Sequence, residues 1–153
     1  MKGFFNKILR VNLKTRTFKE EPISDSVYET YLGGKGLGSY LLMKENPPGV
    51  DPLSPENKLI FCTGPITDTR IYSSCRHGVF TKSPLTEIFS ESYSGGKVAE
   101  PMSRTGYDAF IFEEASSGPV WIEISDQNVT FHDAKDLWGR YLFYRRPSIT
   151  ENQ

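Results

Sequence analysis

The chain has 153 residues, of which 37% are hydrophobic and 24% are charged, and its formal net charge is −1. This length corresponds to one domain, and 13% aromatic residues can support a hydrophobic core. The near-neutral charge argues against general binding of nucleic acid or of a membrane surface, since both usually require a basic face. No apolar run of about 18 residues predicts a membrane-spanning helix, and the N-terminus lacks the apolar core of a signal peptide. We therefore expect a cytoplasmic protein.

The N-terminal part of the chain predicts a hairpin followed by two helices and a buried strand. Leu9, Val11 and Leu13 alternate with polar residues, which is the period of a half-buried strand. A proline-glycine segment after the second helix marks its end. The elements expected here are a strand at Leu9–Leu13, a strand at Thr17–Glu20, a helix from Ser24 or Asp25 to about Leu32, a helix from Leu37 to about Glu45 and a strand at Lys58–Thr63.

The C-terminal part predicts mostly short strands. The expected elements are strands at His77–Lys82 and Glu87–Ser92, a helix at Gly95–Arg104, a strand at Tyr107–Glu113, a hairpin of Val120–Ser125 with Asn128–Phe131 and a helix start at Ala134–Leu137. Pro101 weakens the helix pattern, because proline is poorly tolerated in a helix interior. Many short strands, about three helices and no regular strand-helix-strand spacing indicate an α+β fold.

The segment from Arg76 to Gly96 suggests a polyanion site. Arg76 precedes a predicted strand, and Ser94-Gly95-Gly96 precedes a predicted helix. A guanidinium donates paired hydrogen bonds to phosphate oxygens, and a helix N-terminus adds backbone N–H donors. A surface arginine beside an ordinary glycine cap is the alternative, and local chemistry slightly favours it.

Glycine-rich residues Gly33–Gly38 (GGKGLG) allow two interpretations. Glycines before a helix can hold a phosphate. The spacing is not that of a Walker A loop, and the segment follows a helix rather than a strand, which excludes a dinucleotide-binding fingerprint. A glycine at a helix C-terminus together with close packing of two helices is the favoured interpretation.

Cysteine, histidine and the C-terminal residues support weaker hypotheses. Cys75 lies beside Arg76 and His77, which could lower the pKa of its thiol, although mere adjacency is the favoured interpretation. The two cysteines and two histidines lack the paired spacing of a structural zinc site, and two cysteines are too few for a four-cysteine iron–sulfur cluster. A Cys62–Cys75 disulfide is the alternative to free thiols, which a cytoplasmic setting favours. Aromatic and basic residues at 141–146 could stack on nucleic-acid bases, but no groove accompanies them.

Seven segments, colinear from about Lys7 to Gly139, resemble a known family. They are ILRVNLKT (8–15), YLGGKGLGSYLLMKE (31–45), VDPLSPENKLIFCTGPITDT (50–69), VFTKSPLT (79–86), SGG (94–96), GYDAFIFE (106–113) and DLWG (136–139). Together they resemble the N-terminal domain of the tungsten-containing aldehyde ferredoxin oxidoreductase family. VDPLSPENKLI and TKSPLT are long and particular enough to make the resemblance specific.

The resemblance implies both an activity and a site. Members of the family oxidise aldehydes to carboxylic acids and pass the electrons to ferredoxin. They use a tungsten or molybdenum ion held by two pterins (tungstopterin or molybdopterin), a magnesium ion joining the pterin phosphates, and a [4Fe–4S] cluster. The N-terminal domain is the base on which the pterins lie. By resemblance, Arg76 contacts the cofactor, and Tyr93, Ser94 and Gly95 meet a pterin phosphate and its magnesium, the metal through the backbone carbonyl of Tyr93.

The chain also departs from the family. The family usually has asparagine at the position of Tyr93. A second pterin-binding segment, the cluster cysteines and the later domains are not matched, so no catalytic residue is assigned. We expect residues 1–139 to form the pterin-binding domain and residues 140–153 a non-matching, loosely ordered tail.

These departures set the expected role of the chain. It would be a fragment that is inactive alone. Its partners would be the remaining domains or a split-gene partner, with ferredoxin for the intact enzyme and a homodimer as a further option. The alternatives are a non-catalytic pterin- or phosphate-binding module, a subunit of a split enzyme, or an inert pseudogene product.

Overall fold

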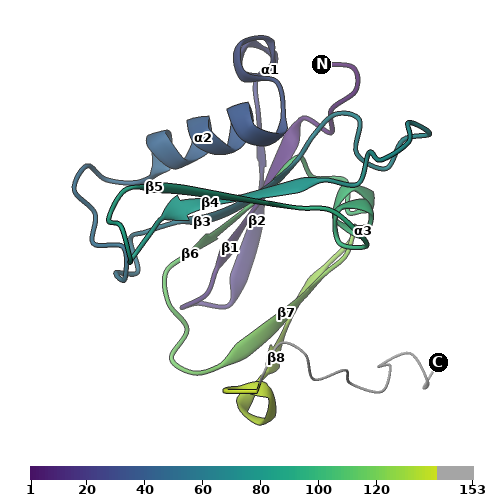
Figure 1. Cartoon of the computed structure of the whole chain (residues 1–153). Coiled ribbons are helices and arrows are strands. Elements are labelled where there is room, and N and C mark those ends of the chain that lie inside the picture. Colours follow the sequence, from purple (N-terminus) through teal and green to yellow (C-terminus); the bar gives the residue numbers. More distant parts are fainter. Residues whose placement is uncertain (141–153) are drawn as a thin grey trace, which may run out of the picture.

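A six-stranded mixed sheet lies at the centre of the computed structural model, which describes residues 1–140 (Figure 1). The strand order is β2-β1-β6-β3-β4-β5, and β1 pairs with β6 in parallel while every other neighbouring pair is antiparallel. The strands are β1 (Lys7–Asn12), β2 (Thr17–Pro22), β3 (Leu59–Thr63), β4 (His77–Lys82), β5 (Phe89–Ser94) and β6 (Ala109–Glu113). A separate hairpin consists of β7 (Val120–Ile124) and β8 (Val129–Asp133).

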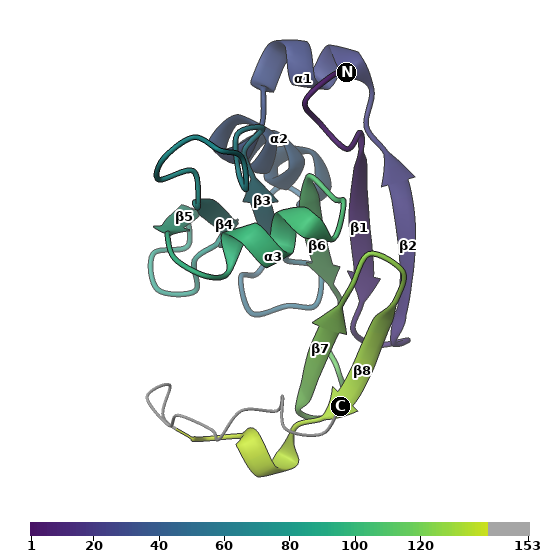
Figure 2. The ribbon, with the colours of Figure 1, turned by 90° about the vertical axis from the view of Figure 1, so that its right-hand side faces the viewer.

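Helices cover the sheet on both sides. The helices α1 (Asp25–Tyr31) and α2 (Gly34–Glu45) lie over one face, and α3 (Ala99–Arg104) lies over the other, as the two perpendicular views show (Figures 1 and 2). A short 3₁₀ turn, η1 (Lys135–Leu137), follows β8. Among residues 1–140, no helix is both long and apolar enough to cross a bilayer. The predicted α+β fold is confirmed.

Two hydrophobic clusters follow from strand alternation, because neighbouring residues of a strand face opposite sides of the sheet. Ile8 packs under α1 and α2, whereas the next residue, Leu9, packs on the α3 side. Leu37 and Leu41 of α2 fill the first cluster together with fully buried Phe80 of β4. The β7–β8 hairpin closes the second cluster with Val129 and Ile122.

Most elements differ from the sequence prediction by one or two residues at a boundary, and the starts of α2, β5 and α3 differ in ways that matter for the site. α2 begins at Gly34 rather than Leu37, so the glycines belong to its first turn. β5 begins at Phe89 because Ser83 to Ile88 form a longer turn, in which Glu87 N–H bonds the carbonyl of Ser83. α3 begins at Ala99, which places Pro101 in the first turn, where its missing N–H has no intrahelical partner to lose.

A cluster of ion pairs around Arg10 of β1 links β2, α2 and β6. The Arg10 guanidinium, only 11% exposed, bonds Glu21 at 2.9 Å and lies 3.0 and 3.1 Å from the carboxylates of Glu45 and Glu113. The hydrogen bonds from Arg10 lower the pKa of Glu21 from 4.5 to about 2. Folding therefore favours the ionised form of this carboxyl.

The low pKa of Glu21 predicts a component of acid unfolding. Because the unfolded chain takes up this proton at higher pH than the folded one, the contribution of Glu21 is fully present above pH 4.5 and is lost as the pH falls toward 2. We expect the free energy of unfolding of Glu21→Gln to fall less steeply than that of wild type between pH 5 and 2, as measured by urea unfolding. Exposed Glu29, in Glu29→Gln, serves as the control. Parallel curves for wild type and Glu21→Gln would contradict the expectation.

Candidate functional site

The four residues assigned to cofactor binding lie together at one end of the β4–β5 hairpin. The register pairs His77 with Ser94 and Gly78 with Tyr93, which brings Arg76 opposite Gly95 just beyond the ladder. A Cβ atom added at Gly95 would lie 3.6 Å from Nε of Arg76. The structure thus joins two sequence segments about twenty residues apart through ordinary antiparallel pairing.

Ser94-Gly95-Gly96 does not begin a helix, and that part of the prediction is wrong. Ser94 is the last residue of β5, and Gly96 adopts a left-handed φ of +95° in the connection to α3. The six-residue α3 starts at Ala99 behind Val98, which makes no side-chain cap. The backbone donors near Arg76 are therefore those of a strand end and a loop, without the dipole of a helix N-terminus.

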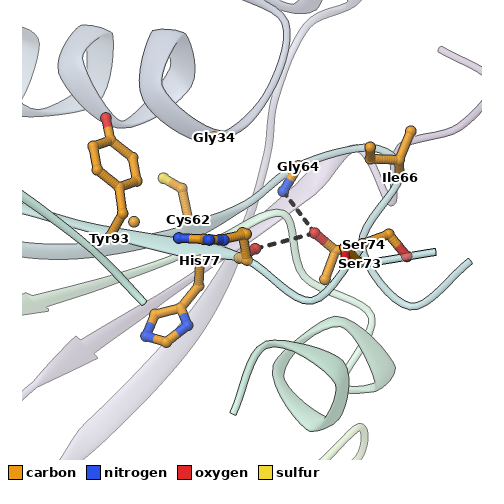
Figure 3. A pocket seen from close by; sticks show the side chains of 11 residues that line it. Gly34, Cys62, Gly64, Ile66, Ser73, Ser74, His77 and Tyr93 are labelled. Carbon is orange, nitrogen blue, oxygen red and sulfur yellow. Dashed lines mark hydrogen bonds between the residues drawn. The ribbon is translucent and has the colours of Figure 1, made fainter. Parts of the chain in front are cut away.

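A cavity of about 190 Å³ lies between α2, β4, β5 and the loop that follows β3 (Figure 3). Arg76 and Tyr93 line it, together with Gly34 at the start of α2 and Cys62 of β3. Ser94 and Gly95 are outside this lining and stand at the neighbouring hairpin end. Because Arg76 both lines the cavity and lies beside Gly95, the cavity and the hairpin end form one candidate site.

Arg76 is the cation available at this site. Its side chain is exposed, and within residues 1–140 it has no hydrogen bond or ion pair. By contrast, Arg10 and Arg104 are both held by carboxylates. A guanidinium without a protein partner retains its paired N–H donors for a phosphate or carboxylate ligand.

Tyr93 forms the rim of the cavity. Its ring meets that of Phe80 edge-on, with centroids 6.0 Å apart, and its hydroxyl donates to Glu91 at 3.0 Å. Glu91 in turn pairs with Lys35 of α2 at 2.7 Å. Partial burial and the Glu91 carboxylate raise the pKa of Tyr93 to about 12, so the phenol stays neutral at physiological pH and serves as a hydrogen-bond donor.

The glycines of residues 33–38 serve close packing. A Cβ atom at Gly36 would lie 1.9 Å from the backbone oxygen of Tyr31, and one at Gly38 would lie 2.3 Å from the ring of Phe80. This supports the packing interpretation of the segment. The expected glycine at the end of the first helix is wrong, because Leu32 occupies that position with a left-handed φ of 56°.

Within residues 1–140 the Cys75 thiol makes no hydrogen bond with Arg76 or His77, so mere adjacency stays the favoured interpretation of Cys75-Arg76-His77. The imidazole of His77 lies on the opposite side of its strand from Cys62 and Tyr93 (Figure 3), and burial lowers its pKa. Cys62 and Cys75 are both free thiols, as predicted, and burial raises the pKa of Cys62.

Within residues 1–140, no group of three or more histidine, cysteine or acidic side chains could hold a metal ion. The aromatic-basic run at 141–146 lies outside the described residues.

Sequence reasoning missed Thr67 and Glu91. Thr67 contacts the backbone of Arg76, and Glu91 contacts Tyr93 and Lys35. No spacing rule identifies Thr67, because the loop brings its partner Arg76 near. Glu91 and Tyr93 are two residues apart on β5, so strand alternation places them on one face, but the contact of Glu91 with Lys35 joins residues 56 positions apart and has no local signal.

Comparison with known proteins places the chain in a family. The family model for the aldehyde ferredoxin oxidoreductase N-terminal domain matches residues 8–152. The tungsten-containing aldehyde ferredoxin oxidoreductase of Pyrococcus horikoshii is 46% identical over 93% of this chain and 23% of its own length. The protein of the same name from Pyrococcus furiosus is 42% identical over 92% of this chain and 23% of its length.

More distant relatives share the same region. The aliphatic sulfonate oxidoreductase, WOR-like subunit, of Pyrococcus furiosus is 32% identical over 91% of this chain and 22% of its own length. A solved structure, the active site complex BamBC of benzoyl coenzyme A reductase with 1,5-dienoyl-CoA, matches 88% of this chain with a TM-score of 0.85 and 33% identity, over 21% of its own chain.

These matches define the extent of the similarity. The chain spans about a quarter of the length of the curated relatives. The matched range continues past Gly139, and the boundary expected at 139/140 stays a prediction because residues 141–153 lie outside the described part. A match over nearly the whole chain, with the same fold, shows the family: this chain belongs to the aldehyde ferredoxin oxidoreductase N-terminal domain family.

Proposed function

We propose that this chain is the N-terminal, pterin-cofactor-binding part of an aldehyde:ferredoxin oxidoreductase. The single observation that carries the proposal is the placement of Arg76, a guanidinium without a protein partner within the described residues, on a cavity beside Gly95. The family relationship supplies the ligand class, since the relatives are tungsten-containing enzymes. The residues present fit a phosphate-bearing cofactor.

Each of the four residues has a distinct role in this proposal. The guanidinium of Arg76 donates to a pterin phosphate. Gly95 and Ser94 leave the backbone of the hairpin end close to that phosphate, and a larger side chain at Gly95 would approach Arg76. When the cofactor is bound, the main-chain carbonyl of Tyr93 would serve as a ligand of its magnesium ion, because magnesium prefers oxygen ligands. A main-chain ligand does not depend on the side chain, so tyrosine in place of asparagine leaves it available.

The iron–sulfur cluster, the substrate pocket and the ferredoxin contact of the enzyme are not assigned to this chain. When bound, the tungsten- or molybdenum-pterin group supplies the two-electron chemistry that converts an aldehyde to a carboxylic acid. The two cysteines of this chain cannot supply the four thiolates of a [4Fe–4S] cluster. We therefore assign the cluster, the substrate pocket and the ferredoxin contact to further domains or to the product of a separate gene. The free thiols support a cytoplasmic location.

Replacing Arg76 tests the proposal. Arg76→Met should weaken binding of inorganic pyrophosphate about 10- to 100-fold, because a charge-assisted pair of hydrogen bonds is lost. Isothermal titration at low ionic strength measures the dissociation constant, and the tungsten and pterin content of chain purified from tungstate-supplied cells gives a second readout. Arg70→Met, which changes an exposed arginine outside the cavity lining, is the matched control. Equal loss of affinity in both variants would indicate nonspecific charge.

A non-catalytic pterin- or phosphate-binding module is the second candidate, and the same cavity supports it. Aldehyde-dependent viologen reduction separates the two functions. The enzyme-part proposal expects no turnover by this chain alone and turnover once the remaining polypeptide is supplied. Binding of the cofactor that never leads to turnover, even with that polypeptide, would favour the module. Turnover by the chain alone would contradict both.

A further inference from the structure

The loop between β3 and β4 determines where Arg76 stands. The chain leaves β3 at Thr63 and returns to the sheet at His77, immediately after Arg76. Two residues of the loop that are not glycine, Asp68 and Ser73, have left-handed φ angles of 60° and 63°. Such conformations persist only where the surroundings hold them, so the contacts that anchor this loop are informative.

Thr67 joins the start of the loop to its end. Thr67 is buried, with 8% of the residue exposed. The hydroxyl accepts a hydrogen bond from the N–H of Gly64 at 3.1 Å and donates one to the backbone carbonyl of Arg76 at 3.3 Å; both are drawn as dashed lines in Figure 3. One side chain therefore fixes the position of the Arg76 backbone against the turn that follows β3.

Contacts with α3 hold Thr67 and its neighbour from the other side. The carbonyl of Thr67 accepts a hydrogen bond from the hydroxyl of Ser103 at 3.4 Å. Asp68 receives two hydrogen bonds from the Arg104 guanidinium, at 2.7 and 2.9 Å, and these lower the pKa of the Asp68 carboxyl. These contacts hold the backbone at Thr67 and Asp68 against α3, and the position of the Thr67 hydroxyl is held with it.

Arg76 is held in place through its backbone, because its side chain has no hydrogen bond or ion pair within residues 1–140. The backbone of Arg76 is held by Thr67 on one side and by the pairing of His77 with Ser94 on the other. The guanidinium itself has no partner in the described part of the chain. Its direction therefore depends on the direction of its backbone, and small misplacement of a binding group is costly to function.

We propose that Thr67 is a positioning residue for Arg76, which sets the direction of the guanidinium toward the anion. This inference rests on the proposed function of Arg76 as the phosphate ligand. Valine at position 67 would keep the shape of the side chain while leaving the Gly64 N–H and the Arg76 carbonyl without their partner. Serine would retain the hydroxyl and both hydrogen bonds.

A double-mutant cycle tests the proposal. Isothermal titration with inorganic pyrophosphate compares wild type, Thr67→Val, Arg76→Met and the double variant. We expect Thr67→Val to weaken binding about 5- to 10-fold when Arg76 is present and less than about 2-fold in the Arg76→Met background, since residues that act through one another are not additive. Thr67→Ser should restore wild-type affinity.

Two further measurements make the cycle interpretable. Thr69→Val removes another hydroxyl of the same loop, which bonds the carbonyl of Ile66 rather than Arg76, and should leave affinity unchanged. The NMR signal of the Arg76 Nε–H group should move in Thr67→Val and stay in place in Thr67→Ser, without any ligand. Thermal unfolding of each variant identifies a loss of binding caused by unfolding, and if Thr67→Val does not fold, Thr67→Ala takes its place in the cycle with the same expected outcomes.

The outcomes separate the two proposals. Equal weakening by Thr67→Val in both backgrounds, an unmoved Arg76 signal in that variant, or an affinity in Thr67→Ser as low as that in Thr67→Val, would overturn the positioning role. Unchanged affinity in Arg76→Met would instead overturn the phosphate-binding function. In that case the Arg76 signal still decides whether Thr67 positions the guanidinium.

Discussion

Asp108→Ala should lower the free energy of unfolding by about 3–5 kcal/mol, because it removes a buried acceptor on which three donors converge. Asp108 is 6% exposed and accepts hydrogen bonds from the Tyr28 hydroxyl at 2.5 Å and from the N–H groups of Phe5 and Asn6 at 3.1 and 2.8 Å. Its loss would leave the fully buried Tyr28 hydroxyl unpaired. Chemical denaturation at neutral pH measures the change.

Tyr28→Phe is the matched control for this contact. It removes one of the three donors and leaves Asp108 with two partners, so we expect a smaller loss of about 1–2 kcal/mol. The N-terminal segment before β1 should also lose hydrogen-exchange protection in Asp108→Ala. A loss in Asp108→Ala no larger than that in Tyr28→Phe would show that the backbone donors find water at no cost.

Gly36→Ala should destabilise the protein by about 3 kcal/mol or more, although alanine is the better helix former by about 1 kcal/mol. The added Cβ would lie 1.9 Å from the backbone oxygen of Tyr31, and a backbone atom cannot rotate away. Relief of the clash requires α1 and α2 to separate, which loosens the cluster beneath them. Thermal and urea unfolding measure the effect.

Gly118→Ala is the control for this substitution. Gly118 has no atom within 4 Å of an added Cβ and does not have a positive φ. We expect its free energy of unfolding to stay within about 0.5 kcal/mol of wild type. Stabilisation by Gly36→Ala would mean that helix propensity outweighs the close approach of α1, and would contradict the packing role of the glycine-rich segment.

The exposure of the candidate site indicates that tight binding of an anion would need contacts from a second polypeptide segment. Arg76 and Tyr93 stand on an exposed rim, so an anion bound by this chain alone would keep contact with water, where charged contacts are weak. A tight grip on a cofactor needs a second surface that excludes water. The chain covers about a quarter of its relatives, which is consistent with such a surface lying in further domains.

The hairpins and the two helices at the N-terminal end could be predicted from the sequence because their signals are local. Alternation of Leu9, Val11 and Leu13 identifies β1, and the turn residues identify the β7–β8 hairpin. The family was recognisable from long colinear segments such as VDPLSPENKLI, and the comparison confirmed it. Local chemistry already pointed to Arg76, Ser94 and Gly95 as an anion site, and the resemblance added Tyr93 and the class of cofactor.

The tertiary structure decided how those residues meet. A helix was expected after Ser94 because glycines often precede helices, but pairing with His77 extends β5 through Ser94, and Pro101 is tolerated only in a first turn. Parallel pairing of β1 with β6 joins strands nearly one hundred residues apart, which no local period encodes. The hydrogen bond from Thr67 to Arg76 likewise exists only because the loop after β3 closes on itself, since such contacts depend on spatial proximity rather than on spacing along the chain.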